Sequence, residues 1–384
     1  MIKNQKEPEN INENTVKDKS KYEKIPLFAI ISLSLAALCG VIYLISCLSE
    51  SFADFFNIYI ASVFRFLFAQ ITNIFPFSFA EMIMILLPLL LVLALWYLLK
   101  YRCKTKKAVL VSIVCIISVA SFLLSSFVLT FSSGYRGSTV DKKLGLSQEK
   151  LGAEDLHASA VYLVDKINVL SEKIEYGEDG FSIMPYELKE MNSKIIEAYD
   201  RYCEDNYFIN NFHSRIKPVV LSEPMSYTHI TGVYTFFTGE ANLNVNFPDY
   251  TLPYTAAHEL AHQRGIARED EANLIAFLVS IESDDDYILY CAYLNMYEYV
   301  SSALYKADKE LYKEARASLN ATVRTELAAY SKFFNQYRES TASKVSNTVN
   351  DVYLKTQGTV GKKSYGMVVD LAVAYLKKED LIEK

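Results

Sequence analysis

Three long apolar stretches, separated by polar or basic connections, fill much of the first third of the chain. They cover residues 25–48, 79–99 and 108–131 and hold a single charged residue, Glu81. At 1.5 Å per residue in a helix, each is long enough to cross a hydrocarbon core of roughly 30 Å. We therefore predict three transmembrane helices.

The segments around these stretches have different compositions. Residues 1–24 are polar and lack hydrophobic periodicity, which predicts a disordered cytoplasmic tail. The connector 49–78 is rich in Phe and Ile and carries few charges. We expect it to lie in the membrane interface or to fold back against the bilayer.

Basic residues near span ends indicate the orientation, because they are retained in the cytoplasm. The loop between the second and third spans is strongly basic, so the third span should carry residues 132–384 to the outer side of a multi-pass cell-membrane protein. A lipoprotein cleavage box at 44–47, acylating Cys47, is an alternative that leaves the domain outside as well. The basic residues of the loop are Lys100, Arg102, Lys104, Lys106 and Lys107.

Residues 132–384 have the composition of a soluble domain, and most of them show helical patterns. Short runs that alternate apolar and β-branched residues predict a small sheet. The fold class is thus α+β: a three-helix membrane anchor followed by a mainly helical domain. The predicted helices are 148–175, 185–205 and nearly everything from residue 251 on, with a late break at Gly358 and Gly361, and the predicted strands are 218–221, 232–238 and 241–247.

Composition excludes some function classes. The net charge of −6 and the lack of a basic patch with interleaved aromatic residues argue against nucleic acid as a partner. The six cysteines include no CxxC pair, which argues against a cysteine-based metal cluster. Cys203 and Cys291 lie in the soluble part, either as a disulfide or as two buried thiols.

The segment 253–265 combines helix signals with metal-binding residues. Pro253 suits a first helical turn and Gly265 a left-handed end. His258 and His262 are one turn apart on such a helix, so both imidazoles can bind one Zn²⁺. A chance match on an amphipathic helix is the alternative explanation.

Glu259 stands between these histidines, rotated by about 100° from His258. That rotation directs its carboxylate toward a water on the metal rather than toward the metal itself. Zinc lowers the pKa of such a water toward about 7, and Glu259 would act as the general base. The pattern predicts zinc-dependent hydrolysis, with peptide bonds as the expected substrate.

A catalytic zinc ion needs a third protein ligand and an open position. Glu269, Asp270 and Glu271 open the next predicted helix and are all candidates. An acidic first turn that complements the helix dipole is the structural alternative.

The combination of HExxH, a glycine and Glu-x-x-Ala-Asn resembles the gluzincin-like zinc peptidases. More closely, the chain is similar to an uncharacterised bacterial family of three-span membrane proteins with such a zincin-like domain. Arg268 stands where metzincins place a histidine, which disfavours a metzincin assignment. The resemblance rests on the segments 76–78, 238–242, 258–265 and 363–366.

The resemblance implies roles for particular residues. Glu269 would be the third ligand, with Glu271 as the alternative, and Asn273 would hold a ligand by a hydrogen bond. The strand region 232–247 would bind extended peptide by main-chain pairing, with ordinary sheet packing as its alternative. Tyr365 would donate to an oxyanion; His229 is a weaker candidate for that role and fits a surface strand end better.

We therefore expect a peptide or protein substrate at the outer membrane face. A non-catalytic membrane sensor or scaffold that retains the zincin fold is the alternative function, although only catalysis requires Glu259. An intramembrane protease is disfavoured because polar residues such as Asp249, Arg264 and Arg268 flank the motif.

Overall fold

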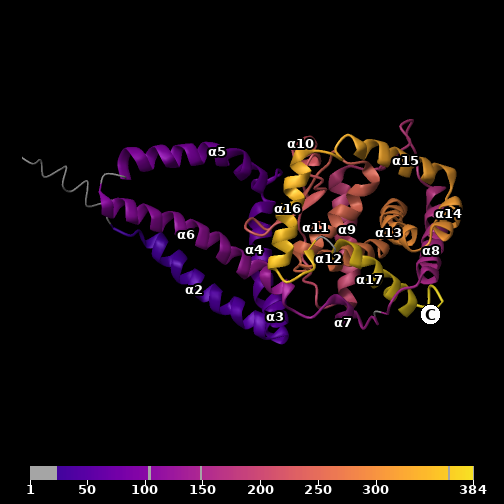
Figure 1. Ribbon diagram of the computed structural model, residues 1–384, viewed down its shortest axis with the longest axis horizontal. Helices are drawn as coiled ribbons and strands as arrows, with labels where there is room; N and C mark the ends of the chain where they lie inside the picture. The colour runs from indigo at the N-terminus through magenta and orange to yellow at the C-terminus, as the bar shows by residue number, and fades with distance from the viewer. Residues whose placement is uncertain (1–23, 103–104, 148, 362–363, 384) are drawn as a thin grey trace, which may run out of the picture. The chain divides into compact units, whose positions relative to one another are not determined.

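The computed structural model describes residues 24–102, 105–147, 149–361 and 364–383 (Figure 1). The predicted tail 1–24 therefore lies outside the described residues except for Lys24. The chain forms two compact units. One comprises the chain up to Ile42 together with Met82–Val128, and the other comprises Tyr43–Glu81 and Leu129–Lys384.

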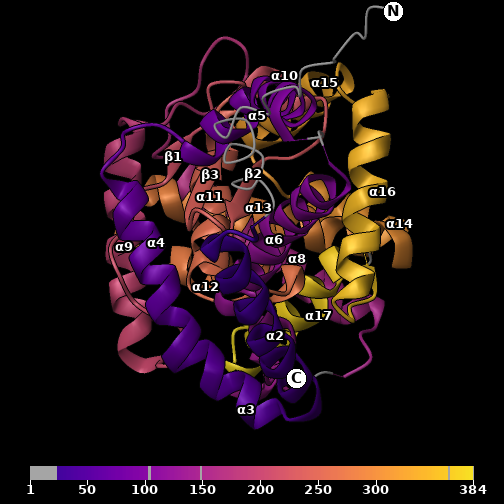
Figure 2. The same ribbon diagram turned by 90° about the vertical axis from the view of Figure 1, so that its left-hand side faces the viewer.

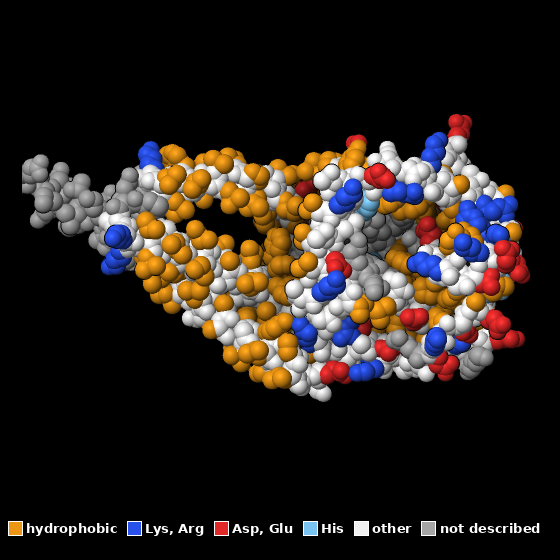
Figure 3. All heavy atoms as spheres, viewed as in Figure 1, with side chains coloured by type: hydrophobic (Ala, Val, Ile, Leu, Met, Phe, Trp, Pro, Cys, Tyr) orange, Lys and Arg blue, Asp and Glu red, His pale blue; other side chains and the backbone are white. Residues whose placement is uncertain are grey.

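Most of the first unit consists of three apolar helices. They are α2 (Leu27–Leu48), α5 (Phe79–Tyr97), extended by a π-helical turn η2 (Leu98–Arg102), and α6 (Lys106–Thr130). All three are long and apolar enough to cross a membrane, which confirms the prediction of apolar N-terminal helices. Hydrophobic side chains cover their surfaces (Figure 3), an arrangement that suits contact with lipid rather than water.

The connector between the first two predicted spans is helical and belongs to the second unit. It comprises α3 (Glu50–Phe55), the π-helix η1 (Phe56–Ala61) and α4 (Ser62–Asn73). Taken together, Glu50–Asn73 is a fourth helical segment long and apolar enough to cross a membrane. The sequence grouped it with the membrane region; in the structure its residues form hydrogen bonds with Asn210, His213 and Gly265 of the globular part.

A small mixed sheet lies in the second unit. Its strands β1 (Lys217–Pro218), β2 (Gly232–Thr235) and β3 (Glu240–Leu243) are arranged in the order β1-β3-β2. β3 pairs in parallel with β1 and antiparallel with β2, with Tyr234 opposite Ala241. β2 is therefore an edge strand with one side free of strand partners within the described sheet.

Helices make up most of the second unit, which confirms the prediction of a mainly helical domain with a small sheet. Gly358 and Gly361, both with positive φ, separate α16 from α17, as the sequence indicated. The helices are η3 (Ser132–Tyr135), α7 (Val140–Leu144), α8 (Ala153–Ser171), α9 (Leu188–Asp205), α10 (Ser222–Ser226), η4 (Asp249–Thr251), α11 (Leu252–Gln263), α12 (Glu269–Ile281), α13 (Asp286–Ala307), α14 (Lys309–Ala317), α15 (Ala321–Asn335), α16 (Thr341–Thr356) and α17 (Ser364–Lys378).

The core of this unit is built around α11, α12 and α13 (Figures 1 and 2). The middle of α12, residues 272–280, is buried without interruption, because neighbouring helices surround it. Tyrosines of α13 such as Tyr290 and Tyr297 are buried in this core, and Tyr299 lines a cleft. Cys203 and Cys291 are buried free thiols.

Candidate metal centre

The two histidines of the HExxH segment lie one above the other on α11. Pro253 stands in the first turn of this helix, and Gly265 follows its end with a φ of +100°, so the predicted start and stop signals both operate. The ring centroids of His258 and His262 are 4.5 Å apart. The helix therefore presents both imidazoles to the same side, with His262 buried and His258 reaching a cleft.

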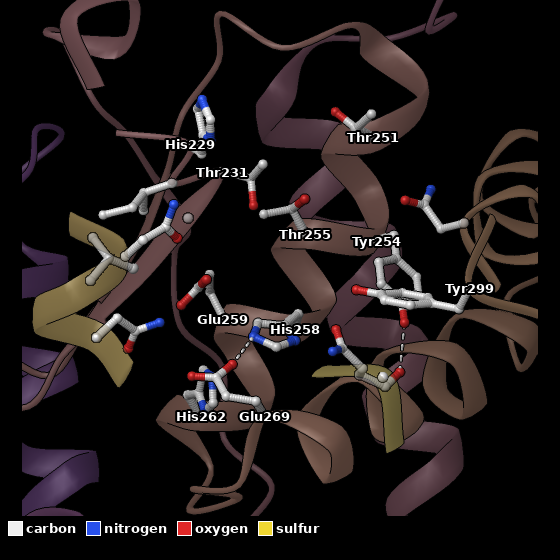
Figure 4. A pocket seen from close by; sticks show the side chains of 18 of the residues that line it. His229, Thr231, Thr251, Tyr254, Thr255, His258, Glu259, His262, Glu269 and Tyr299 are labelled. Carbon is white, nitrogen blue, oxygen red and sulfur yellow. Dashed lines mark hydrogen bonds and ion pairs between the residues drawn. The ribbon is translucent and has the colours of Figure 1, made fainter. Parts of the chain in front are cut away.

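Glu269, the first residue of α12, faces both imidazoles. Its Oε2 lies 3.3 Å from His258 Nε2 and 3.5 Å from His262 Nε2. Potential ligand atoms of the three residues all lie within 4.8 Å of one another. Figure 4 shows these side chains, and that of Glu259, converging on one place at the cleft floor.

Glu271, the alternative ligand, lies elsewhere. Its Oε1 accepts hydrogen bonds from the backbone N–H of Val140 at 3.1 Å and from Arg268 at 3.0 Å. The half-turn offset between the two carboxylates accounts for this difference, because residues two apart on a helix point to nearly opposite sides.

Hydrogen bonds fix the orientation of one of the histidines. His262 Nδ1 lies 2.7 Å from the carbonyl oxygen of Ile266, so Nδ1 is the protonated nitrogen and Nε2 remains free to face Glu269. His258 Nδ1 has no hydrogen-bond partner among the described residues. Asn273, predicted to hold a ligand, lines the cleft; its backbone carbonyl accepts from the Tyr254 hydroxyl at 2.8 Å, and its side-chain Nδ2 has no partner among the described residues.

The turn between α11 and α12 is held from the connector helices. Asn57 donates to the carbonyl oxygen of Gly265 at 3.0 Å, and Arg65 donates to Asn57 Oδ1 at 2.8 Å. A Cβ at Gly265 would lie 2.5 Å from the Arg65 guanidinium, so only glycine fits. This packing fixes the path of the chain between His262 and Glu269.

Glu259 is buried against the edge strand. Its side chain would be 2.6 Å from a Cβ at Gly232, and it accepts a hydrogen bond from the backbone of Tyr234. Its Oε2 has no partner among the described residues. The strand region 232–247 predicted to bind peptide therefore begins beside the predicted general base.

Burial and mutual attraction shift the pKa values at this centre. Burial raises the pKa of Glu259, and the nearby histidines offset only part of that effect. For Glu269, burial acts in the same direction, but His262 and His258 outweigh it and lower the pKa. Burial disfavours the charged form of His262, yet Glu269 raises its pKa to about 9. Two carboxyl groups and an imidazole are thus held close together away from bulk water, where each changes the pKa of the others.

The centre opens into a cleft of about 1090 Å³ lined by α11, α12, α13, α16 and the segment that leads into β2. His229 lines this cleft, and its Nε2 lies 2.8 Å from the carbonyl oxygen of Tyr337. Tyr365 belongs to α17, but its side chain lies outside the described residues. Glu298 and Tyr299 of α13 also line this cleft, and no motif in the sequence singled out Glu298.

The residues present fit a zinc ion. Two imidazole nitrogens and a carboxylate oxygen are the ligand set of many catalytic zinc sites. His262 has the backbone hydrogen bond that zinc-binding histidines commonly make through their other nitrogen. The ligand atoms border a cleft, which leaves room for a further position.

Comparison with known proteins identifies a family for the chain but no activity. A family model described as a protein of unknown function, DUF3810, matches residues 52–373. Searches of curated proteins and of solved structures found no match to the chain.

Proposed function

The chain belongs to the DUF3810 family of unknown function, and we propose from its own residues that it is a membrane-anchored zinc-dependent peptidase. The convergence of His258, His262 and Glu269 at the floor of an open cleft, next to Glu259, is the observation that supports this most directly. A gluzincin-like arrangement follows, with the third ligand on the helix after HExxH.

In this proposal His258, His262 and Glu269 hold the metal. Bound zinc would supply Lewis-acid chemistry, polarising the substrate carbonyl and making a water molecule more acidic. Glu259 accepts the proton of the attacking water and passes it to the amine nitrogen as the C–N bond breaks. Its buried position keeps the carboxylate basic, because burial disfavours its charged form.

The edge strand β2 provides a place for the peptide backbone. Its pairing with β3 leaves its other edge without a strand partner in the described sheet, and residues 228–234 line the cleft. An extended peptide can add to such an edge by main-chain hydrogen bonds. This pairing would bring the scissile bond beside Glu259.

Metal content tests the ligand assignment. Purified full-length protein should hold about one zinc per chain, and His258→Ala and His262→Ala should lose it, since two remaining ligands bind metal weakly. Zinc is measured by plasma mass spectrometry. Full occupancy in both variants would remove the metallohydrolase assignment.

Proteomics of the shed and envelope fractions tests the reaction. Wild-type cells should contain peptide fragments that are missing from Glu259→Gln cells, because this change removes the base while keeping all three ligands. Identical fragments across many growth conditions would instead favour a sensor that binds ligands without cutting them.

A further inference from the structure

The cleft contains one carboxylate that the proposed reaction does not use. Its charged carboxylate lining comprises Glu259 and Glu269 at the metal centre and Glu298 on α13. Glu298 also borders a second, smaller hollow of about 410 Å³ between α13, α14 and α15. It therefore lies where the cleft continues beyond the metal centre.

Glu298 has little to neutralise or satisfy it within the protein. The hydroxyl of Tyr250 donates to its Oε2 at 3.5 Å, a long hydrogen bond. Within the described ranges no lysine, arginine or histidine forms an ion pair with it: Lys306 of the cleft lining is exposed, and Arg316 and Arg338 line the smaller hollow without pairing with it. The carboxylate thus keeps capacity for a further partner.

A second carboxyl group, that of Glu326, acts on Glu298, and burial raises the pKa of Glu326 as well. Glu326 is fully buried, and its own oxygens are occupied: Ser182 donates to it through its backbone N–H at 2.7 Å and its hydroxyl at 2.6 Å, and Tyr290 donates as well. Burial, and then repulsion from Glu326, raise the pKa of Glu298 to about 7. A cation at this place would relieve that repulsion.

Aromatic rings flank the same carboxylate. Tyr299 and Tyr330 line the cleft together with Glu298, and Tyr330 also borders the smaller hollow beside it. A tyrosine ring attracts a cation at its face. A carboxylate beside tyrosine rings is an environment suited to an ammonium or guanidinium group.

We propose that Glu298, with Tyr299 and Tyr330, forms a subsite for a positively charged group of a peptide substrate. The group is either a lysine or arginine side chain or the free terminal ammonium. The inference rests on the proposed function, since it assumes that peptides enter the cleft, and it makes Glu298 a residue that determines specificity.

Cleavage profiling tests the subsite on the full-length, zinc-loaded protein in lipid nanodiscs. The protein digests a peptide library, and mass spectrometry identifies the cut sites. Wild type should favour peptides with a positive group at one fixed distance from the cut, and Glu298→Gln should lower that preference at least tenfold. Glu310→Gln, which removes an exposed carboxylate on α14, should keep it. Matched peptides with lysine replaced by norleucine, or with an acetylated terminus, identify which positive group is bound.

Two results would overturn the subsite while leaving the peptidase proposal intact. One is a wild type without preference for positive charge, and the other is a preference that survives in Glu298→Gln. If no peptide is cut at all, binding of the same lysine peptides to zinc-loaded Glu259→Gln protein decides. At least tenfold weaker binding in the Glu259→Gln, Glu298→Gln double variant supports the subsite, whereas equal or undetectable binding refutes it.

Discussion

Neighbouring carboxylates on one helix turn have different surroundings in this protein. Glu269 faces two imidazoles, while Glu271 is taken by Arg268 and by the backbone of Val140. Helical geometry alone predicted that only one of the two could face the histidines. The partner of the other, Val140, is more than a hundred residues away in the chain, so the sequence could not supply it.

Substitution of these two glutamates should separate their roles. Glu269→Gln should weaken zinc binding by about a hundredfold or more, because it removes a charged ligand. Glu271→Gln should change zinc affinity far less and act mainly on stability. Competition with a zinc chelator measures both, and the reverse order would move the ligand to Glu271.

Gly232 controls the position of the proposed base. Its φ is not in the left-handed region, so alanine fits the backbone, but the new Cβ would lie 2.6 Å from the Glu259 side chain. Gly232→Ala should keep zinc and lower peptide hydrolysis by roughly a hundredfold, the cost of about 1 Å of misplacement. Gly40→Ala, which meets no atom within 4 Å, is the control. Unchanged hydrolysis in Gly232→Ala would argue against Glu259 as the base.

Glu298 should make the stability of the protein depend on pH. Its pKa is about 7 in the folded protein against an ordinary value of 4.5, since burial and Glu326 disfavour its charged form. The folded state therefore binds the extra proton between these values, and the contribution of Glu298 to stability falls as pH rises from about 4.5 through about 7.

Thermal unfolding of the detergent-solubilised protein tests this dependence. Glu298→Gln should unfold at a higher temperature than wild type at pH 8 and at a similar temperature at pH 4.5. At the higher pH the wild-type carboxyl group is charged and its burial costs free energy, whereas the amide of the variant stays neutral. An equal difference at both pH values would show that packing, and not ionisation, separates the two proteins.

At the scale of elements, the sequence predicted types better than boundaries. Helical periodicity located α8, α9 and the helices after Thr251, whereas the strands are shorter than their β-prone runs, with β2 ending at Thr235. A strand extends only as far as its partner allows, and the partner is set by the fold.

The connector 49–78 shows the same limit more sharply. Its apolar composition predicted a segment that lies in the membrane interface or folds back against the bilayer; the structure adds that it is helical and that Asn57, Arg65 and Thr72 are buried. Arg65 donates to the carbonyl oxygen of Thr130 and to Asn210, residues 65 and 145 positions away. A local sequence pattern cannot predict hydrogen-bond partners this far along the chain. The role of the connector in holding the α11–α12 turn is therefore visible only in the structure.

The turn between α4 and α5 is tied to the sheet by a buried ion pair. Lys217 Nζ lies 3.7 Å from Glu240 Oε1, and the Glu240 carboxylate accepts from the N–H groups of Phe79 and Ala80 at the start of α5. Lys217 also donates to backbone carbonyls of this turn, including that of Thr72 at 2.9 Å. These contacts involve the segments 76–78 and 238–242, which are among those that carry the family resemblance.

Removing one partner of this pair should be costly. Glu240→Ala leaves the Lys217 charge and two N–H groups without their acceptor, so we expect a loss of about 3–5 kcal/mol in the free energy of unfolding. Glu310→Ala breaks the exposed pair with Lys313 and should cost at most about 1 kcal/mol. Denaturant unfolding in detergent compares them, and similar losses would mean that the buried pair contributes no more than an exposed one.

At the scale of the whole molecule, the placement of charge along the chain sets the expected orientation. The basic loop between α5 and α6 should stay in the cytoplasm, which sends the chain after α6 outward. Counting α2, α5 and α6 as spans leaves the lysine-rich tail inside as well. Counting Glu50–Asn73 as a fourth span would place that tail outside, against the same rule.

The burial of Arg65 decides between these counts. Its side chain is fully buried, and its two terminal guanidinium nitrogens donate to protein oxygens within the globular unit. We therefore predict three spans, a cytoplasmic N-terminus and an external C-terminal domain. Reporters on the full chain measure both ends: a fluorescent protein that matures only in the cytoplasm should be bright at the N-terminus and dark after Lys384, where alkaline phosphatase should be active. A bright C-terminal fusion would reverse the orientation, and a dark N-terminal one beside an external domain would make Glu50–Asn73 a span.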